Sequence, residues 1–137
     1  MSVVTTVLDD ADGLADLLTG LVPQLGPDDE LVVVDGGSAQ GTPSVARRAA
    51  EVDPRVRLVV EAGAGISRGR NVGIELARHD AVACTDAGCV PDPGWLDALR
   101  RAFDRHPHVA LWTGTYRVAA HKPWELALAA VGYPSIE

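Results

Sequence analysis

Short apolar runs alternate along this chain with segments of helical periodicity, and this alternation constrains the fold more than any other feature. Apolar runs without regular polar positions are typical of strands buried on both faces, whereas apolar residues recurring every three or four positions indicate helices. Such strands separated by helices predict an α/β fold, with a mostly parallel sheet and helices packed on both of its faces. The expected strands are Val3–Leu8, Leu31–Val34, Arg57–Val60, Ala81–Cys84 and Val109–Val118.

The helices expected between these strands are marked by capping residues and by apolar stripes. Thr42-Pro43 combines an N-cap residue with a first-turn proline, and Asp92-Pro93 starts a later helix in the same way. The expected helices run from Leu14 to Val22, Thr42 to Val52, about Arg68 to Arg78, Asp92 through Phe103 and Trp124 to Val131. In the fourth of these we expect one buried stripe, made of Trp95, Leu96, Leu99 and Phe103.

The length of 137 residues suits one domain with a substantial core, and we expect a single domain over residues 1–137. Hydrophobic residues make up 47% of the chain but aromatic residues only 4%, so valine, leucine and alanine must build the core. The formal net charge of −7 argues against a nucleic acid or an anionic membrane surface as the main partner.

We expect a cytoplasmic protein without a membrane segment. The first residues lack the basic region of a signal peptide, and the late apolar stretch Leu126–Val131 is too short to span a bilayer. Two cysteines are too few for a disulfide framework, and Cys84 lies in an apolar run, where a buried free thiol is common. Free thiols fit a reducing compartment.

Charged residues follow the ends of several expected strands. Asp35 and Asp86 end the second and fourth strands, and Arg68 and Arg70 follow a glycine-rich turn after the third. In a parallel sheet these ends lie on one edge, where α/β proteins bind their ligands. Arginines at the start of a helix, together with free backbone N–H groups, would suit a diphosphate. The alternatives remain that each aspartate caps a turn and that the arginines lie on a solvated helix face.

Four sequence blocks follow one another in a specific order. The blocks are Val3-Val4, Val32 through Asp35 to Thr42, Gly65 through Arg68-Gly69-Arg70-Asn71 to Ile74, and Thr85-Asp86-Ala87-Gly88-Cys89. Together they resemble the nucleotide-sugar-binding N-terminal portion of family 2 glycosyltransferases, which have a GT-A, Rossmann-like fold. The resemblance covers roughly the first hundred residues, and it implies inverting transfer of a sugar from a nucleotide-diphospho-sugar donor to an acceptor that the sequence does not identify.

The resemblance assigns nucleotide-binding roles to six residues. Asp35 and the backbone near Thr6 would lie at the base, and the ribose and diphosphate would lie beside three residues of the third block, namely Arg68, Arg70 and Asn71. Asp86 would be the first acid of the Asp-x-Asp motif, which binds Mg²⁺ or Mn²⁺ in this family.

Three positions depart from the family pattern. Gly36 stands where many members have a second acid after the strand, and Gln40 replaces the usual aspartate of the Asp-Gly-Thr block. Gly88 stands where the second acid of Asp-x-Asp would be, so Asp86 would be the one carboxylate of the motif left for a cation. Divalent cations prefer several oxygen ligands, and one carboxylate with phosphates and water is a sparse set.

The acceptor site and the general base come from the half that follows this portion in the family. We therefore expect the chain to be truncated before the acceptor half, and no residue is assigned as catalytic. The alternative function is a non-catalytic nucleotide-sugar-binding or assembly subunit. A dinucleotide site is a further alternative, because the Gly63–Gly69 run resembles Gly-x-Gly-x-x-Gly, although it is one residue too long and follows the third strand.

An α/β sheet without its second half would expose apolar side chains that the missing half covers. Such a surface is commonly buried by self-association, so we expect a homo-oligomer or a partner. The candidate residues are Trp112, Trp124, Leu126, Leu128 and Val131.

Overall fold

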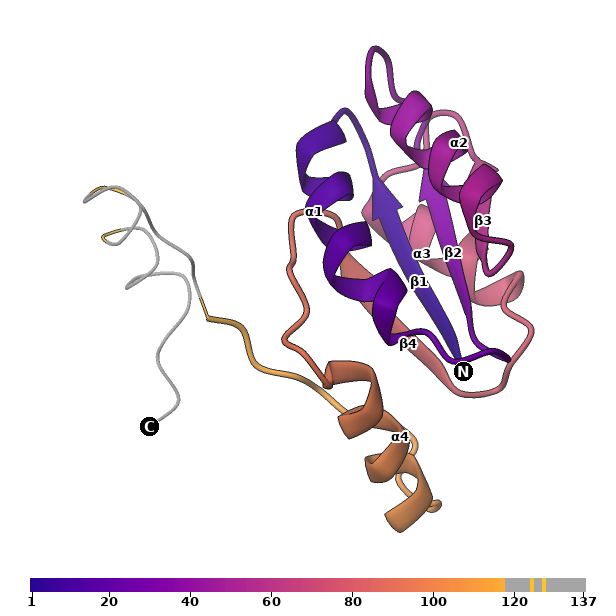
Figure 1. Ribbon diagram of the computed structural model, residues 1–137, viewed down its shortest axis with the longest axis vertical. Coiled ribbons are helices and arrows are strands. Elements are labelled where there is room, and N and C mark those ends of the chain that lie inside the picture. Colours follow the sequence, from indigo (N-terminus) through magenta and orange to yellow (C-terminus); the bar gives the residue numbers. More distant parts are fainter. Residues whose placement is uncertain (118–123, 125–126, 128–137) are drawn as a thin grey trace. The chain divides into compact units, whose positions relative to one another are not determined.

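The structure is a computed structural model that describes residues 1–117, 124 and 127, and the chain divides into two compact units, Met1–His106 and Pro107–Glu137. The first unit is an α/β domain in which strands and helices alternate as predicted (Figure 1). Its elements are β1 (Ser2–Val7), α1 (Ala11–Leu21), the 3₁₀ turn η1 (Val22–Gln24), β2 (Glu30–Asp35), α2 (Thr42–Val52), β3 (Val56–Val60), α3 (Ile66–Glu75), β4 (Val82–Asp86) and α4 (Trp95–Arg105).

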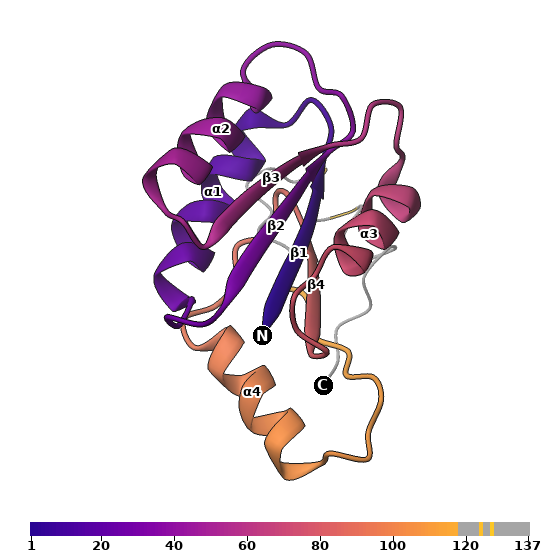
Figure 2. The same ribbon diagram turned by 90° about the vertical axis from the view of Figure 1, so that its right-hand side faces the viewer.

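The four strands form a parallel sheet with the order β3-β2-β1-β4. In the register of the sheet, Val4 of β1 lies opposite Val32 on one side and Cys84 on the other. Helices α1 and α2 lie on one face of the sheet and α3 lies on the other (Figure 2). The predicted parallel sheet with helices on both faces is therefore confirmed.

Alternating strand residues supply the two halves of the core. Val3, Val7 and Val33 face α1, where Leu14 and Leu17 are fully buried. The intervening residues of the same strands face α3 and form a second cluster of Val4, Val32 and Val34, against which Val72 packs. The buried hydrophobic residues are valine, leucine and alanine, as the low aromatic content predicts.

Two glycines allow α3 to lie directly on the sheet. A Cβ atom added at Gly73 would overlap the Val4 side chain and lie 3.2 Å from Val34 Cγ2. One turn earlier, a Cβ atom at Gly69 would lie 3.0 Å from Thr6 Cγ2. Because no larger residue fits at either position without movement, the backbone of α3 is held close against β1.

Buried charges tie together the amino ends of the strands. Glu30 is 1% exposed, and its carboxylate accepts hydrogen bonds from Ser2 Oγ (2.7 Å), the backbone N–H of Arg78 (2.5 Å) and the guanidinium of Arg57 (2.8 Å). Burial alone would raise the pKa of Glu30, but these three donors outweigh it and the pKa is lowered. The pKa of the neighbouring carboxyl group, Asp29, is also lowered despite burial.

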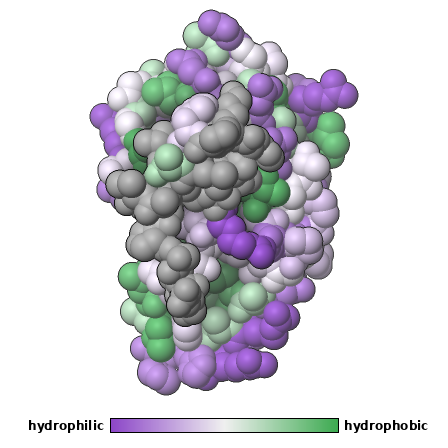
Figure 3. Space-filling model, turned by 90° about the vertical axis from the view of Figure 1, so that its left-hand side faces the viewer, coloured by the Kyte–Doolittle hydropathy of each residue, from purple (hydrophilic) through white to green (hydrophobic). Residues whose placement is uncertain are grey.

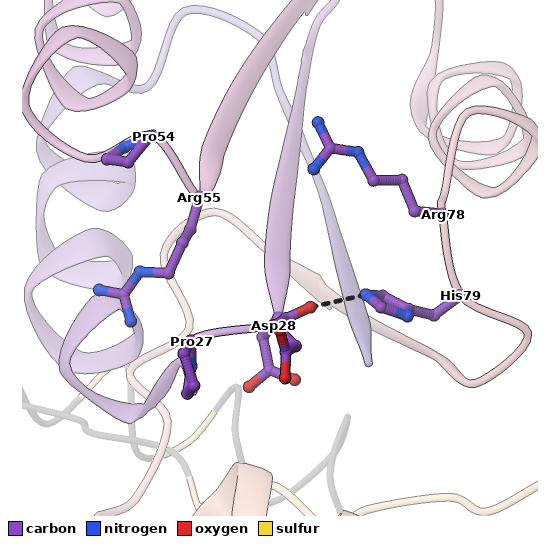
Figure 4. A pocket seen from close by; sticks show the side chains of 7 residues that line it. Pro27, Asp28, Pro54, Arg55, Arg78 and His79 are labelled. Atoms are coloured by element: carbon purple, nitrogen blue, oxygen red, sulfur yellow. Dashed lines mark hydrogen bonds between the residues drawn. The ribbon is translucent and has the colours of Figure 1, made fainter.

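The second buried carboxylate, Asp29, pairs with the ammonium group of Met1 at 2.9 Å and with Arg100 of α4. Burial would raise the pKa of Asp29, but the ammonium group, the Gly26 N–H and Arg100 lower it overall. A hollow of about 390 Å³ opens beside this cluster, between Arg55, Arg78 and His79 (Figure 4). Arg55 pairs with Asp53 at 2.6 Å, and Arg78 lies 3.4 Å from Glu30. Both guanidinium groups therefore form ion pairs within the domain and stabilise the fold.

We expect the free energy of unfolding to fall steeply in acid. A carboxyl group whose pKa is lowered on folding stabilises the protein above its unfolded pKa, and this contribution disappears as the pH falls through the folded pKa. The unfolded values are about 3.9 for Asp29 and about 4.3 for Glu30. Urea unfolding between about pH 7 and pH 3 would measure the loss. If the Glu30→Gln variant loses stability over the same range as steeply as the parent, Glu30 is not a source of the dependence.

Helix α4 corrects the predicted buried stripe. Leu96 is fully buried, and Trp95 and Leu99 pack against the core cluster, but Phe103 is only half-buried and is not part of that contact. The helix packs at η1, where Gln24 Oε1 accepts a hydrogen bond from the Leu96 N–H at 3.2 Å. Because α4 contacts η1 through its first turns, Phe103, which lies about two turns after Leu96, is beyond this contact.

We expect Leu96→Ala to lower the free energy of unfolding by about 2–5 kcal/mol, because it empties a fully buried site. Phe103→Ala, by contrast, should cost only about 1 kcal/mol, since the ring is only partly withdrawn from water. Chemical denaturation of the two variants beside the parent protein measures both values. Equal losses in the two variants would contradict this placement of the helix.

The second unit contains a predicted strand that the structure does not form. Residues 109–117 have neither strand nor helix backbone, and Val118 lies outside the described residues. Apolar alternation was the only signal for that strand, and a strand also needs a neighbour for its backbone hydrogen bonds. Of the predicted helix Trp124–Val131, Trp124 and Ala127 are described and are helical. In the described part of the chain, no helix has the length and apolar character needed to cross a membrane.

Candidate functional site

A hollow of about 320 Å³ lies at the carboxyl ends of the strands. The residues that line it come from the ends of β1 and β2, the segment after β1, the turn before α3, the first turns of α3 and the end of β4. The open end of a parallel sheet is where α/β folds bind their ligands. The lining residues are Thr6, Val7, Leu8, Asp10, Val34, Gly36, Ala64, Gly65, Ile66, Gly69, Asp86 and Ala87.

An ion pair stands beside this hollow. Asp86 ends β4 and lies opposite Thr6 of β1 in the register of the sheet. The Arg70 guanidinium of α3 donates to Asp86 Oδ1 at 2.6 Å, and the side chains of Arg70 and Asp86 are 37% and 47% exposed. A half-exposed pair of this kind can exchange partners with a ligand, because neither charge is sealed from water. The structure therefore brings together Thr6, Arg70 and Asp86.

Asp35 also lies at the carboxyl edge, but its side chain is directed to its own loop. The residue is 1% exposed, and its Oδ1 accepts hydrogen bonds from the N–H groups of Gly37 (3.2 Å) and Ser38 (2.8 Å). Gly37 has a φ of +95°, which a glycine adopts without strain. Asp35 thus shapes the turn after β2. This agrees with the alternative considered from the sequence, in which the aspartate caps a turn.

The two remaining predicted residues lie outside the lining of the hollow. Arg68 of α3 forms an ion pair with Glu61, and its side chain is 68% exposed. Asn71, also on α3, is exposed. Both are on the same helix as Arg70, and Arg68 lies in its first turn, where backbone N–H groups lack helical partners.

Asp10 and Ile66 are among the lining residues that were not predicted as site residues. Asp10 is the N-cap of α1, and its Oδ1 accepts a hydrogen bond from the Gly13 N–H at 2.9 Å. Ile66 begins α3 and is exposed at the mouth. The sequence signal for Asp10 was the cluster of acids before α1, which predicts a helix start but does not predict a neighbouring pocket.

Residues 2–127 match the family model described as Glycosyl transferase family 2. The chain belongs to glycosyl transferase family 2. Among its relatives, Succinoglycan biosynthesis protein ExoO of Rhizobium meliloti is 36% identical over 103 residues, which are 74% of this chain and 28% of ExoO. Uncharacterized glycosyltransferase YibD of Escherichia coli is 33% identical over 87 residues, 64% of this chain and 25% of YibD. Across such relatives the chain spans only 21–33% of their length.

Solved glycosyltransferase structures share the fold. Residues 1–349 of S. aureus TarS superpose with a TM-score of 0.69 at 22% identity, over 77% of this chain and 32% of that fragment. The mannosyltransferase PcManGT of Pyrobaculum calidifontis, in complex with GDP-Man and Mn²⁺, gives a TM-score of 0.63 at 29% identity, over 74% of this chain and 30% of PcManGT. The predicted family and its GT-A fold are confirmed.

The structure explains two departures of this family 2 chain from the family pattern. A Cβ atom at Gly36 would lie 2.7 Å from the carbonyl oxygen of Ala64, so an acid at this position would require the backbone to move. Gly88 has a φ of +86°, a conformation that residues with side chains rarely adopt. An aspartate at position 88 would therefore be strained, and its Cβ would lie 3.6 Å from Asp10 Oδ2.

The donor set around Asp86 does not fit a resident divalent cation. Such an ion takes six or more oxygen ligands, several of them carboxylates in tight sites. Asp86 already accepts from Arg70, and position 88 offers no side chain. Within residues 1–117, 124 and 127, no three His, Cys, Asp or Glu residues are grouped so that they could share a metal ion.

Cys84 corrects a further expectation, because it is exposed on β4 instead of buried. It lies on the α3 side of the sheet, opposite Val4, but α3 packs over β1 and β2 and leaves this part of β4 uncovered. Partial desolvation raises the pKa of the Cys84 thiol, the Arg70 charge lowers it and Asp86 raises it, with a net upward shift. The thiol is therefore a poor nucleophile at neutral pH.

Proposed function

We propose that this chain is the donor-binding portion of an inverting family 2 glycosyltransferase and that it binds a nucleotide-diphospho-sugar. The observation that carries the proposal is the Arg70–Asp86 pair at the hollow on the carboxyl edge. Family membership supports it, as do GDP-Man bound by PcManGT and UDP bound by TarS in their own structures. Because the chain spans a minor part of its relatives, the activity of the whole protein is part of the proposal.

In this proposal the nucleoside enters the hollow and the diphosphate lies at the start of α3. Thr6 and the apolar residues beside it, Val7 and Leu8, offer a surface for the base and ribose. The free N–H groups of α3 and the guanidinium of Arg70 suit the negative charge of a diphosphate. Arg68 and Asn71 would contribute from the same helix. Asp35 would act on the base side by holding the turn at Gly37 and Ser38.

Mg²⁺ or Mn²⁺ is a plausible participant for the family, since the PcManGT structure contains Mn²⁺. In this chain Asp86 is the carboxylate that the family resemblance assigns to the ion. The poor donor set described above makes the ion an exchangeable companion of the nucleotide at most, and no step of the proposal depends on it.

The second candidate function is a non-catalytic nucleotide-sugar binder or assembly subunit. It is favoured by Gly88, which has a φ of +86° and leaves the second position of the Asp-x-Asp motif without a carboxylate. Both candidates require nucleotide binding, and only the enzyme requires release of the nucleoside diphosphate from a sugar donor. A coupled assay for UDP or GDP release therefore separates them, with binding but no release selecting the second.

Calorimetric titration with UDP and GDP tests the shared part of the proposal. We expect at least one of them to bind, and Arg70→Ala to weaken binding about tenfold or more, because one charge-assisted contact is lost. Arg101→Gln is the matched control, since it removes an exposed positive charge on α4 at the other end of the unit. Absence of binding heat for both nucleotides under all metal conditions would refute the proposal.

We further propose that the chain self-associates or binds a partner through the second unit. Trp124 there is 58% exposed, and Leu126, Leu128 and Val131 lie outside the described residues. In the coloured part of the face in Figure 3, hydrophobic residues are scattered among polar ones, so that part of the face offers no single apolar patch. Sedimentation velocity over a wide concentration range tests the proposal, and a constant monomer would contradict self-association.

A further inference from the structure

The Arg70–Asp86 pair indicates which positive charge the site offers to a bound diphosphate. This inference rests on the proposed function. We propose that Arg70 and a divalent cation are alternative partners of Asp86, and that this chain binds the donor diphosphate through Arg70 without needing the cation. The Asp86 carboxylate, which the family resemblance assigns to a cation, is held through Oδ1 by the Arg70 guanidinium at 2.6 Å.

The backbone at Arg70 is held in place by the packing of its helix. Gly69 and Gly73 bring the backbone of α3 against Thr6 and Val4, and neither position tolerates a larger residue without movement. Arg70 directly follows Gly69, so its side chain starts from a backbone held at the edge of the hollow. A cation bound to Asp86 would therefore meet a fixed positive charge a few ångströms away, which lowers its affinity.

Few further carboxylate oxygens in the hollow are available to offset that repulsion. Position 88 is a glycine with a φ of +86°, so it supplies no second carboxylate. The other acid of the hollow, Asp10, already uses Oδ1 to cap α1. A diphosphate faces the opposite situation, because a guanidinium has five donors and the bond to Asp86 through one nitrogen leaves others for phosphate oxygens.

The first experiment measures Mn²⁺ alone, without nucleotide, by electron paramagnetic resonance of the free ion. We expect weak binding to the parent chain and about tenfold tighter binding to Arg70→Gln, because that change frees Asp86 and removes the competing charge. The double variant Arg70→Gln/Asp86→Asn should lose the gain, and Arg101→Gln should bind Mn²⁺ like the parent. Unchanged affinity in Arg70→Gln would overturn the inference, even if no nucleotide binds.

The second experiment measures UDP and GDP affinity in chelator and in excess Mn²⁺. We expect the affinity of the parent to change less than about threefold between the two conditions. Asp86→Asn should bind at least as tightly as the parent, because Arg70 is released from its pair. Arg70→Gln should lose about tenfold or more in chelator and recover part of that loss with Mn²⁺.

Two other outcomes would overturn the inference. If chelator abolishes nucleotide binding by the parent, and Asp86→Asn does the same, the cation carries the site and the inference is wrong. If Asp10→Asn, which keeps an N-cap side chain on α1, lowers Mn²⁺ affinity of the parent as much as Asp86→Asn, the two acids share a cation and the inference is also wrong. Failure of every nucleotide to bind refutes the proposed function instead, and the Mn²⁺ measurement still decides the competition.

Discussion

Replacing Glu30 by alanine should lower the free energy of unfolding by about 3–5 kcal/mol, the cost of removing one partner from a buried ionic group. The carboxylate is 1% exposed and accepts hydrogen bonds from Ser2, Arg57 and the backbone of Arg78. These donors come from the start of β1, from β3 and from the loop after α3, so the alanine variant leaves three separate segments without their common acceptor. Urea unfolding measures the loss.

Two further variants make this test specific. Glu30→Gln keeps the shape and can still accept hydrogen bonds, so it should lose less than alanine but still leave the Arg57 charge unbalanced. Glu75→Ala is the matched control, because it removes an exposed glutamate from the end of α3 and should change the stability by less than about 0.5 kcal/mol. Similar small losses in all three variants would show that the buried cluster contributes little.

Replacing Gly73 by leucine should cost about 3 kcal/mol or more, because the new side chain has no space between α3 and the sheet. The Cβ atom alone would overlap Val4, before the rest of the leucine is placed. Since α3 carries Arg70, the same change should weaken UDP or GDP binding even under conditions where the variant is folded. Thermal unfolding and calorimetric titration measure the two effects.

The control and the rescue follow from the same packing. Gly65→Ala should be close to neutral in stability, because a Cβ atom there meets no heavy atom within 4 Å. Adding Val4→Ala to Gly73→Leu should recover part of the loss, although Val4→Ala alone is destabilising. If Gly73→Leu unfolds at the temperature of the parent protein, α3 does not lie as close to the sheet as described.

The architecture could be predicted from the sequence because its signals are local. Apolar runs such as Leu31–Val34 are bounded by charges, glycine or proline, and each gives one strand. The carboxyl-edge placement of Asp86 and Arg70 then followed from parallel connectivity, which puts all strand ends on one side. The strand predicted at Val109–Val118 had only its own apolar pattern, and residues 109–117 do not form it.

What the sequence did not reveal depends on contacts between distant segments. Glycine is a weak helix former, so no sequence pattern marked Gly69 and Gly73 as the contact face of α3. Cys84 lies in an apolar run, yet its exposure depends on which strands α3 covers. Whether the Asp35 side chain contacts a ligand or holds its own turn also depends on where the N–H groups of its loop point. Each of these three features is decided by the three-dimensional packing of the chain.

The buried charges at the amino ends of the strands and the hollow at their carboxyl ends lie at opposite edges of one sheet. Substitutions at sites without shared contacts have nearly additive effects on stability. The chain can therefore change its binding residues over evolutionary time without losing the contacts that hold Glu30 and Asp29. This separation gives the domain room to acquire new ligand preferences, and a designer could vary residues 8, 66 and 86 while leaving the folded state intact.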